Sequence, residues 1–335
     1  MAEDIFPVQN STLSEKALTT WIYENYDFQK SVNCIFYRKG LGICDAYRIE
    51  SGEVTRFLKI FMHGRRTETD VSEEVRLLNY LGENGVSVAM PLMKTDGSYT
   101  SELNAPEGKR YAVMYEGVEG DEIGDDENHI RSFGEMVGRF HQCCDDMPGE
   151  YRRKNLDLEY LLDSSIEIIS PFMQHRTEDL DLIMRIAEYC KELIPALLPK
   201  LRPEYGICHG DLYGGDVRFT EDDTAIIFDF DSSGYGWRAL DIGVFTGSPD
   251  WMDTTDEADR IRMKQQRIFL DGYLKYRFIS ENELIVMRLS LPIHHIFLMG
   301  HFLKYYGIHQ GYSFADDEYL EWYMVWFRYW AKENL

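Results

Sequence analysis

Basic side chains are scarce in this 335-residue chain. Lys and Arg together number 35 against 58 Asp and Glu, which gives a formal net charge of −23 at pH 7. A general nucleic-acid binder needs a broad basic face to replace the counterions of the phosphates, and an anionic membrane surface attracts the same kind of face. The charge balance therefore argues against nucleic-acid and membrane partners, whereas a cationic small molecule is compatible with it.

Cysteine and long apolar runs are also scarce. The six cysteines include no CxxC pair and no regular spacing, which argues against a zinc ribbon and a disulfide scaffold. The N-terminal sequence MAEDIFPVQN lacks the apolar core of a signal peptide. The most apolar stretch, residues 289–303, contains proline and histidine, and we expect it to be too short and too polar to span a bilayer. These absences predict a cytoplasmic protein.

The length and the first third of the chain predict two lobes, the first of the α+β class. A chain of 335 residues is about twice the ~150 residues of a typical domain. Residues 34–61 alternate and favour strands, and residues 71–84 have helical periodicity and end before Gly85. Strand-like pieces follow at 86–93 and 111–118. Strands around one helix indicate an antiparallel α+β lobe.

Helical periodicity dominates the rest of the chain. An acidic, glycine-containing segment at 119–128 is expected to link the lobes, although a solvated loop within one domain would look alike. Helices are predicted at 130–144, 180–198 and 263–278. A strand-rich island at 207–231 interrupts them and carries the most informative residues.

That island has the layout of a phosphotransferase catalytic loop followed by a metal loop. His209-Gly210-Asp211-Leu212 is followed by Asp216, and the apolar strand 225–228 ends at Asp229, eighteen residues after Asp211. In kinases, an aspartate of the catalytic loop accepts the proton of the substrate hydroxyl, and a second aspartate after a strand binds Mg²⁺. Carboxylates suit both places, because the phosphoryl group is anionic and the metal that neutralises it prefers oxygen ligands.

The sequence HGDLYGGDVRF…IIFDFDSSGYGWRALDIGVF at 209–245 resembles the active-site run of the aminoglycoside phosphotransferase and choline kinase-like superfamily. Those enzymes use HGDxxxxN, then a strand that ends in an acidic residue, then Asp-Leu/Ile. The resemblance continues at 74–91, 111–120 and 137–141, and so covers most of the chain. It is somewhat closer to the bacterial stress-response kinase A and homoserine kinase-like members than to the antibiotic-resistance enzymes.

The resemblance implies a bilobal protein-kinase-like fold, with a nucleotide-binding lobe at 1–115 and a mainly helical catalytic and substrate-binding lobe at 116–335. It implies ATP and Mg²⁺ as cofactors, and a small-molecule hydroxyl, such as that of an amino alcohol or aminoglycoside, as the phosphoryl acceptor. Two alternatives remain open: a protein Ser/Thr kinase of the stress-response type, and a degenerate kinase-like module that binds nucleotide without turnover.

In the second lobe, the resemblance makes Asp211 the catalytic base and Asp229 the principal Mg²⁺ ligand. His209 would be a structural residue under the loop, and Asp241 would brace the loop from behind. Asp216 stands where the family has Asn. A carboxylate there still offers oxygen to the metal, so Asp216 is the candidate second ligand, and it is also the feature that keeps the degenerate module open.

In the first lobe, the resemblance implies that Lys59 binds the α- and β-phosphates and pairs with Glu74. Gly40 and Gly42 would lie in the loop that covers the nucleotide, where absent side chains let backbone amides approach phosphate. Taken singly, Lys59 could be an ordinary edge-strand lysine and Glu74 an ordinary helix-start charge. The hinge would offer backbone groups to adenine from Glu116, Gly117 and Val118.

Three other patterns have simpler explanations. Residues 228–232, FDFDS, resemble the D-x-D-x-[TS] signature of haloacid dehalogenase-type phosphatases, but that motif usually opens its domain and would leave the HGD loop unexplained. His294, His295, His301 and His309 form no metal-ligand spacing, so we expect a packed helix with polar inner contacts. The aromatic run at 318–330 predicts core packing or the wall of a substrate pocket.

Overall fold

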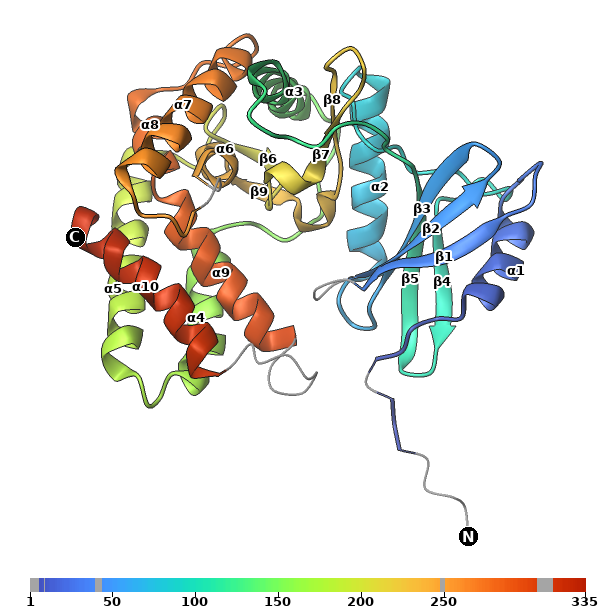
Figure 1. The fold of residues 1–335 in the computed structure, drawn as a ribbon, viewed down its shortest axis with the longest axis horizontal. Coiled ribbons are helices and arrows are strands. Elements are labelled where there is room, and N and C mark those ends of the chain that lie inside the picture. Colours follow the sequence, from blue (N-terminus) through green and yellow to red (C-terminus); the bar gives the residue numbers. More distant parts are fainter. Residues whose placement is uncertain (1–5, 9, 40–43, 248–250, 306–315) are drawn as a thin grey trace. The chain divides into compact units, whose positions relative to one another are not determined.

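The structure, a computed structural model shown in Figure 1, consists of two compact units, Met1–Glu119 and Gly120–Leu335. The division falls four residues after the predicted boundary at 115 (119 − 115). Gly40 and Gly42 lie outside the described residues, so their predicted role in a nucleotide-covering loop stays a prediction. The structure describes residues 6–8, 10–39, 44–247, 251–305 and 316–335.

Over its described residues, the first unit is a five-stranded antiparallel sheet with two helices, which confirms the α+β class. Its strand order is β1-β2-β3-β5-β4, so β3 lies at the centre of the sheet. Alternating burial along β2 buries Tyr47 and Ile49 in the core of the unit. The elements are β1 (Asn33–Lys39), β2 (Cys44–Ser51), β3 (Val54–Phe61), β4 (Thr100–Ala105), β5 (Gly108–Glu116), α1 (Glu15–Asn25) and α2 (Glu68–Glu83).

Helix α2 begins three residues before the predicted start at Val71 (71 − 68). The reason is a capping box: the Thr67 hydroxyl accepts from the Asp70 amide, and the Asp70 carboxylate accepts from the Thr67 amide. The helix ends before Gly85, whose φ of +76° is a conformation that glycine adopts without strain.

Three features of the first unit were not predicted correctly. Residues 86–93 form no regular strand, because proline has no amide hydrogen for a ladder; Pro91 makes an isolated bridge with Tyr115 instead. Strand β4, with the sequence TSELNA, has few of the β-branched and aromatic residues that mark strands. Helix α1 buries only Leu18 and Ile22, which is too few apolar positions to reveal a helix by periodicity.

The second unit is mainly helical. Helix α6 is buried from Arg238 to Thr246 and packs against α7, α8 and α9. Two small antiparallel sheets, β6-β9 and β7-β8, carry the strand-rich island (Figure 1). The elements are α3 (Glu127–Asp145), α4 (Ser164–Ile169), α5 (Thr177–Leu197), β6 (Tyr205–Cys208), β7 (Val217–Phe219), β8 (Ala225–Ile227), β9 (Gly234–Trp237), α6 (Arg238–Gly247), α7 (Asp256–Tyr273), α8 (Glu281–Met287), α9 (Ser290–Tyr305) and α10 (Asp317–Asn334).

The acidic segment at 119–128 is not a free linker over its whole length. The Asp121 amide donates to the Phe219 carbonyl at 2.9 Å, and the Phe219 amide donates back at 3.0 Å. Asp126 then caps α3, which begins at Glu127. The segment is thus built into the second unit from Gly120 onward.

Residues Glu281–Lys304 are long and apolar enough to cross a membrane by length and composition alone, which departs from the expectation for 289–303. Within the second unit, however, 56% of that window is buried, and α9 packs against α4 and α6. A helix in a protein core can have the same length and composition as a membrane-spanning helix, because a protein core and a bilayer both favour apolar residues on every face.

Candidate active site

The HGD motif forms a tight loop directly after β6. Gly210 has φ +85°, a left-handed conformation that favours glycine, and a Cβ there would collide with the Ser232 carbonyl oxygen. The His209 ring is fully buried, and its Nε2 lies 2.9 Å from the Phe228 carbonyl oxygen. The glycine and the histidine therefore hold the loop against the segment that carries Asp229, which agrees with the structural role implied for His209.

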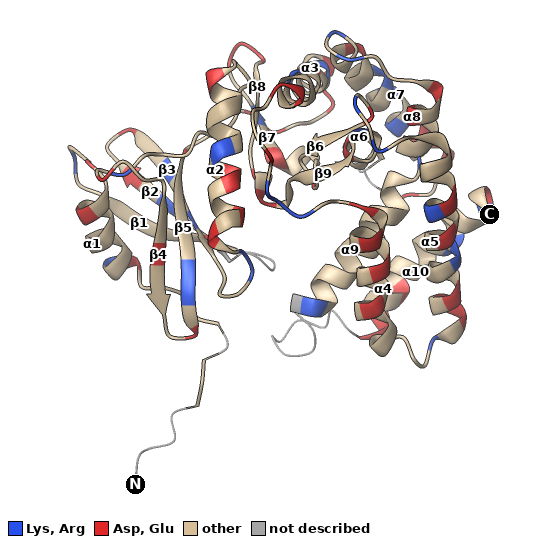
Figure 2. Ribbon diagram, turned by 180° about the vertical axis from the view of Figure 1, so that it is seen from behind, with Lys and Arg blue, Asp and Glu red and all other residues tan. Residues whose placement is uncertain are grey.

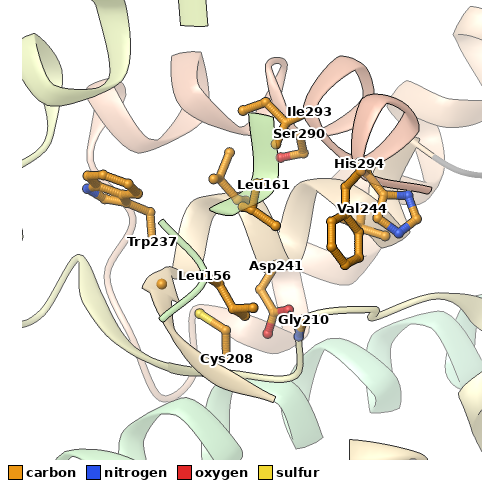
Figure 3. Close-up of a pocket in the computed structure, with 13 residues that line it drawn as sticks. Leu156, Leu161, Cys208, Gly210, Trp237, Asp241, Val244, Ser290, Ile293 and His294 are labelled. Atoms are coloured by element: carbon orange, nitrogen blue, oxygen red, sulfur yellow. Dashed lines mark hydrogen bonds between the residues drawn. The ribbon is translucent and has the colours of Figure 1, made fainter. Parts of the chain in front are cut away.

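Asp241 holds the same loop from behind. Its Oδ2 accepts the His209 amide at 2.8 Å, and its Oδ1 accepts the Gly210 amide at 2.8 Å. Figure 3 shows the Asp241 carboxylate directed at Gly210, at the floor of a cavity of about 40 Å³. These hydrogen bonds are the bracing contact that the resemblance implied for Asp241.

A chain of buried hydrogen bonds fixes Asp241 in turn. Nε2 of His141 lies 3.1 Å from Oδ2 of Asp241, and the Tyr273 hydroxyl lies 2.9 Å from Nδ1 of His141. Burial lowers the pKa of His141 to about 4, so the ring is neutral near pH 7. Burial opposes ionisation of Asp241, but the hydrogen bonds that its carboxylate accepts from His141 and from the His209 amide outweigh burial, and the pKa of Asp241 is lowered. A neutral His141 thus donates a hydrogen bond through Nε2 to Asp241 and accepts a hydrogen bond from the Tyr273 hydroxyl at Nδ1.

Asp211, the predicted base, follows this braced backbone. Its side chain is 36% exposed, and its Oδ1 lies 2.9 Å from Nε2 of His294 on α9. This contact fits the expected packed helix with polar inner contacts, but Asp211 was not predicted as the partner of His294. The spacing of histidines carried no signal for it, because the two residues are 83 positions apart.

Asp216 and Asp229 are brought together by the ends of β7 and β8. The Phe228 amide donates to the Asp216 carbonyl oxygen at 3.0 Å, and Val217 pairs with Ile227. Asp216 is buried, whereas Asp229 is exposed and has φ +66°. A non-glycine residue in this conformation is strained, and such strain concentrates at functional sites. Carboxylate oxygens are the hard donors that Mg²⁺ prefers, so the predicted role of Asp216 and Asp229 as metal ligands stays a prediction.

Lys59 is not an edge-strand residue. It lies on the central strand β3, is only 9% exposed, and is opposite Ala46 on β2 and Val113 on β5. This placement contradicts the interpretation of Lys59 as a solvated edge lysine.

Glu74 is not a solvated first-turn charge either. It is 1% exposed on α2, and its Oε1 accepts the Tyr115 hydroxyl at 2.9 Å. Tyr115 lies opposite Phe57, two residues before Lys59, so the side chains of Tyr115 and Lys59 share one face of the sheet. Glu74 therefore reaches the face that carries Lys59.

The predicted hinge has part of its backbone already paired. The Glu116 amide donates to the Met90 carbonyl at 2.8 Å, and the Gly117 amide donates to the Thr55 carbonyl at 3.2 Å. Neither amide is therefore available to adenine. A contribution of Glu116 to adenine binding would have to come from its carbonyl, and Val118 follows as a half-buried residue after the end of β5.

Most of the aromatic C-terminal run packs in the core, although Trp322 is 45% exposed. Helix α10 buries Tyr323, Trp326 and Phe327, and the His295 ring of α9 lies 4.6 Å from the ring of Trp326. Burial and the neighbouring His294 lower the pKa of His295 well below its usual range, so this ring is neutral. His309 lies outside the described residues.

Residues 43–279 match the phosphotransferase enzyme family. A protein of Synechocystis sp., sll1119, is 38% identical over 247 residues, which are 73% of this chain and 68% of that protein. The amicoumacin kinase of Bacillus subtilis is 22% identical over 246 residues, 72% of each chain. A family match over more than two thirds of the chain establishes the family without settling the acceptor.

Solved structures agree on the fold. An amicoumacin kinase in complex with AMP-PNP, Ca²⁺ and Ami has a TM-score of 0.78 at 19% identity, with 94% of both chains covered. A microcompartment-associated aminopropanol kinase has a TM-score of 0.73 at 16% identity, over 94% of this chain and 95% of that one. The phosphatase interpretation of residues 228–232 is therefore wrong: they follow β8 of a two-stranded antiparallel sheet in a kinase-like fold. The predicted family is confirmed, and the chain belongs to the phosphotransferase enzyme family.

Proposed function

We propose that the protein transfers the γ-phosphoryl group of ATP to a hydroxyl group of a small molecule, first of all an amino alcohol or an aminoglycoside-like compound. The observation that carries the proposal is the braced catalytic loop. Asp241 fixes the loop backbone through two amides, and Asp211 follows directly with a partly exposed carboxylate. A rigid loop that presents one carboxylate is what positioning of a hydroxyl nucleophile requires.

In this mechanism the acceptor hydroxyl donates a hydrogen bond to Asp211. The hydroxyl oxygen attacks the γ-phosphorus, the bond from that phosphorus to the β,γ-bridging oxygen breaks, and the hydroxyl proton passes to Asp211. Lys59, oriented by Glu74, would bind the α- and β-phosphates. Asp216 and Asp229 would hold Mg²⁺, which, when bound, neutralises charge on the phosphates.

The charge of the protein supports a cationic acceptor. The net charge is −23, and acidic positions recur along α5 and α10 of the second unit (Figure 2). An acidic field raises the local concentration of cations such as protonated amines. The similarity to an aminopropanol kinase points in the same direction, since aminopropanol is an amino alcohol.

The experiment is a ³¹P NMR assay of the purified protein with ATP, Mg²⁺ and a panel of hydroxyl acceptors. The panel contains amino alcohols, homoserine, choline, aminoglycosides and a seryl/threonyl protein substrate. We expect equal amounts of ADP and a new phosphomonoester with at least one small acceptor. Phosphorylation of the protein substrate alone would favour the Ser/Thr kinase instead. Absence of ADP with every acceptor, despite bound ATP, would favour the module without turnover.

A further inference from the structure

We infer that His294 is a positioning residue for Asp211, and that α9 thereby supplies a part of the catalytic apparatus that the HGD loop does not contain. Nε2 of His294 lies 2.9 Å from Oδ1 of Asp211, within hydrogen-bond distance. The His294 side chain is 13% exposed, so its orientation is restricted by packing. The inference rests on the proposed function, because it gives His294 a role through the proposed base.

Helix α9 is held firmly enough to aim this side chain. Ser290, one turn before His294, donates to the Ala239 carbonyl of α6 at 3.4 Å and packs directly on Gly243, where a Cβ would collide with its hydroxyl. Residues four apart lie on one face of a helix, so His294 is directed toward the same side as Ser290. The close approach of α6 and α9 therefore determines where His294 lies.

Two adjacent helices thus fix the catalytic loop, one through its backbone and the other through the Asp211 side chain. Asp241 of α6 binds the backbone at His209 and Gly210, and His294 of α9 binds the Asp211 side chain. Gly210, Asp241 and His294 border one cavity, as Figure 3 shows.

The hydrogen bond leaves Asp211 prepared for its proposed task. An ionised carboxylate has two oxygens, and His294 engages Oδ1. Rotation about the terminal side-chain bond is then restricted, so that Oδ2 is held ready for the acceptor hydroxyl. A fixed carboxylate contributes through orientation, and a displacement of about 1 Å can cost on the order of 100-fold in rate.

The test compares His294→Leu, which removes the donor, with His294→Gln, whose amide nitrogen can replace Nε2 as donor. The control is His301→Leu, which changes the same residue type two turns along the same helix. We expect His294→Leu to lower kcat by about 10- to 100-fold while KM for ATP stays within about threefold. We expect His294→Gln to recover to within about fivefold of wild type, and His301→Leu to keep wild-type kcat.

Turnover of His294→Leu at the wild-type rate, or a His294→Gln variant no better than His294→Leu, would overturn the inference. In the Asp211→Asn background, His294→Leu should cost no more than about twofold, because the group that it positions is gone. If His294→Leu lowers kcat in the Asp211→Asn background by the same factor as in wild type, His294 has a structural role and does not act through Asp211.

A second readout covers the case in which His294→Leu fails to fold or the wild type transfers no phosphate. The ¹⁵N and ¹H signals of the His294 imidazole should shift in Asp211→Asn relative to wild type, and the signals of His301 should not. Unchanged His294 signals would overturn the contact itself. Inactivity of the wild type with these shifts present would instead defeat the proposed function and leave the contact standing.

Discussion

Nε2 of His141 lies 3.1 Å from Oδ2 of Asp241, and both side chains are buried. The two residues come from α3 and α6 and are 100 positions apart in the sequence. Because Asp241 also accepts two amides of the catalytic loop, the His141 hydrogen bond connects the core of the second unit to the residue that precedes Asp211. Proton binding to His141 is therefore linked to the stability of this unit.

We predict that the free energy of unfolding falls as the pH falls from about 6.5 to about 4. The folded-state pKa of His141 is about 4 because the ring is buried, whereas an unfolded histidine has its ordinary pKa of 6.5. Between these values the unfolded state binds the proton and the folded state does not, so acid favours unfolding. The cost from His141 between pH 7 and pH 5 is roughly 2 kcal/mol.

Urea unfolding at pH 7 and pH 5 checks this prediction. His141→Gln keeps a donor for Asp241 but cannot titrate, so its loss of stability over this window should be smaller by roughly 2 kcal/mol. Asp241 does not contribute to this window. Because its pKa is lowered from the ordinary value of 3.8, its ionised form stabilises the fold above pH 3.8, and that stabilisation is lost only at lower pH. An identical pH dependence in His141→Gln and wild type would contradict the assignment.

A second prediction concerns Lys59 and Glu74. If they act as one phosphate-positioning pair, Lys59→Ala and Glu74→Ala should each lower kcat/KM for ATP by roughly 10- to 100-fold, the range for a hydrogen bond to a charged group. The double variant should lose much less than the product of the two, since one change already breaks the pair. Lys109→Ala, at an exposed lysine paired with Glu102 in the same unit, is the control and should match wild type. Independent losses would disprove the pairing.

A third prediction concerns Asp216, at the position where the resemblance implies Asn. Its charge adds to that of Asp229, so we expect the wild type to require free Mg²⁺ or Mn²⁺ beyond the amount carried by ATP. Asp216→Asn should lower this requirement and keep or raise turnover, as metal titrations of the rate at fixed MgATP would show. Asp222→Asn, at an exposed turn of the same unit, is the control. No difference between Asp216→Asn and wild type would end the proposed role of Asp216 as a ligand, and activity found only in Asp216→Asn would favour the nucleotide-binding module.

Local patterns predicted most of the fold. The alternation at 34–61 corresponds to β1, β2 and β3, because half-buried strands require it. Capping residues could have corrected the predicted helix starts. Thr255 caps α7, which begins at Asp256, seven residues before the predicted start at 263 (263 − 256). The periodicity missed these first turns because they are polar. Periodicity alone does not register a helical turn that buries few side chains.

The site could be predicted only in part. The residue types and spacing at Asp211, Asp216 and Asp229 predict a phosphotransfer site, and the resemblance placed Asp241 behind the loop. The left-handed conformation of Asp229 and the His294–Asp211 contact depend on how distant segments pack, which one sequence does not encode in any short pattern. The hydrogen bonds of the Glu116 and Gly117 amides could not be predicted for the same reason, because their acceptors lie on other segments of the chain.

The proposed role of Asp211 as the base is tested most directly by the rate of ADP formation by Asp211→Asn, measured with saturating ATP and an acceptor identified in the panel. We predict a kcat that is about 10²- to 10⁴-fold below wild type, with the Kd for ATP unchanged within a few-fold, because the base touches the acceptor and not the nucleotide. Asp229→Asn, in the same assay, should weaken Mg²⁺-dependent ATP binding as well as the rate. A kcat of Asp211→Asn above about a tenth of the wild-type value would contradict the central claim, since a general base contributes more than that.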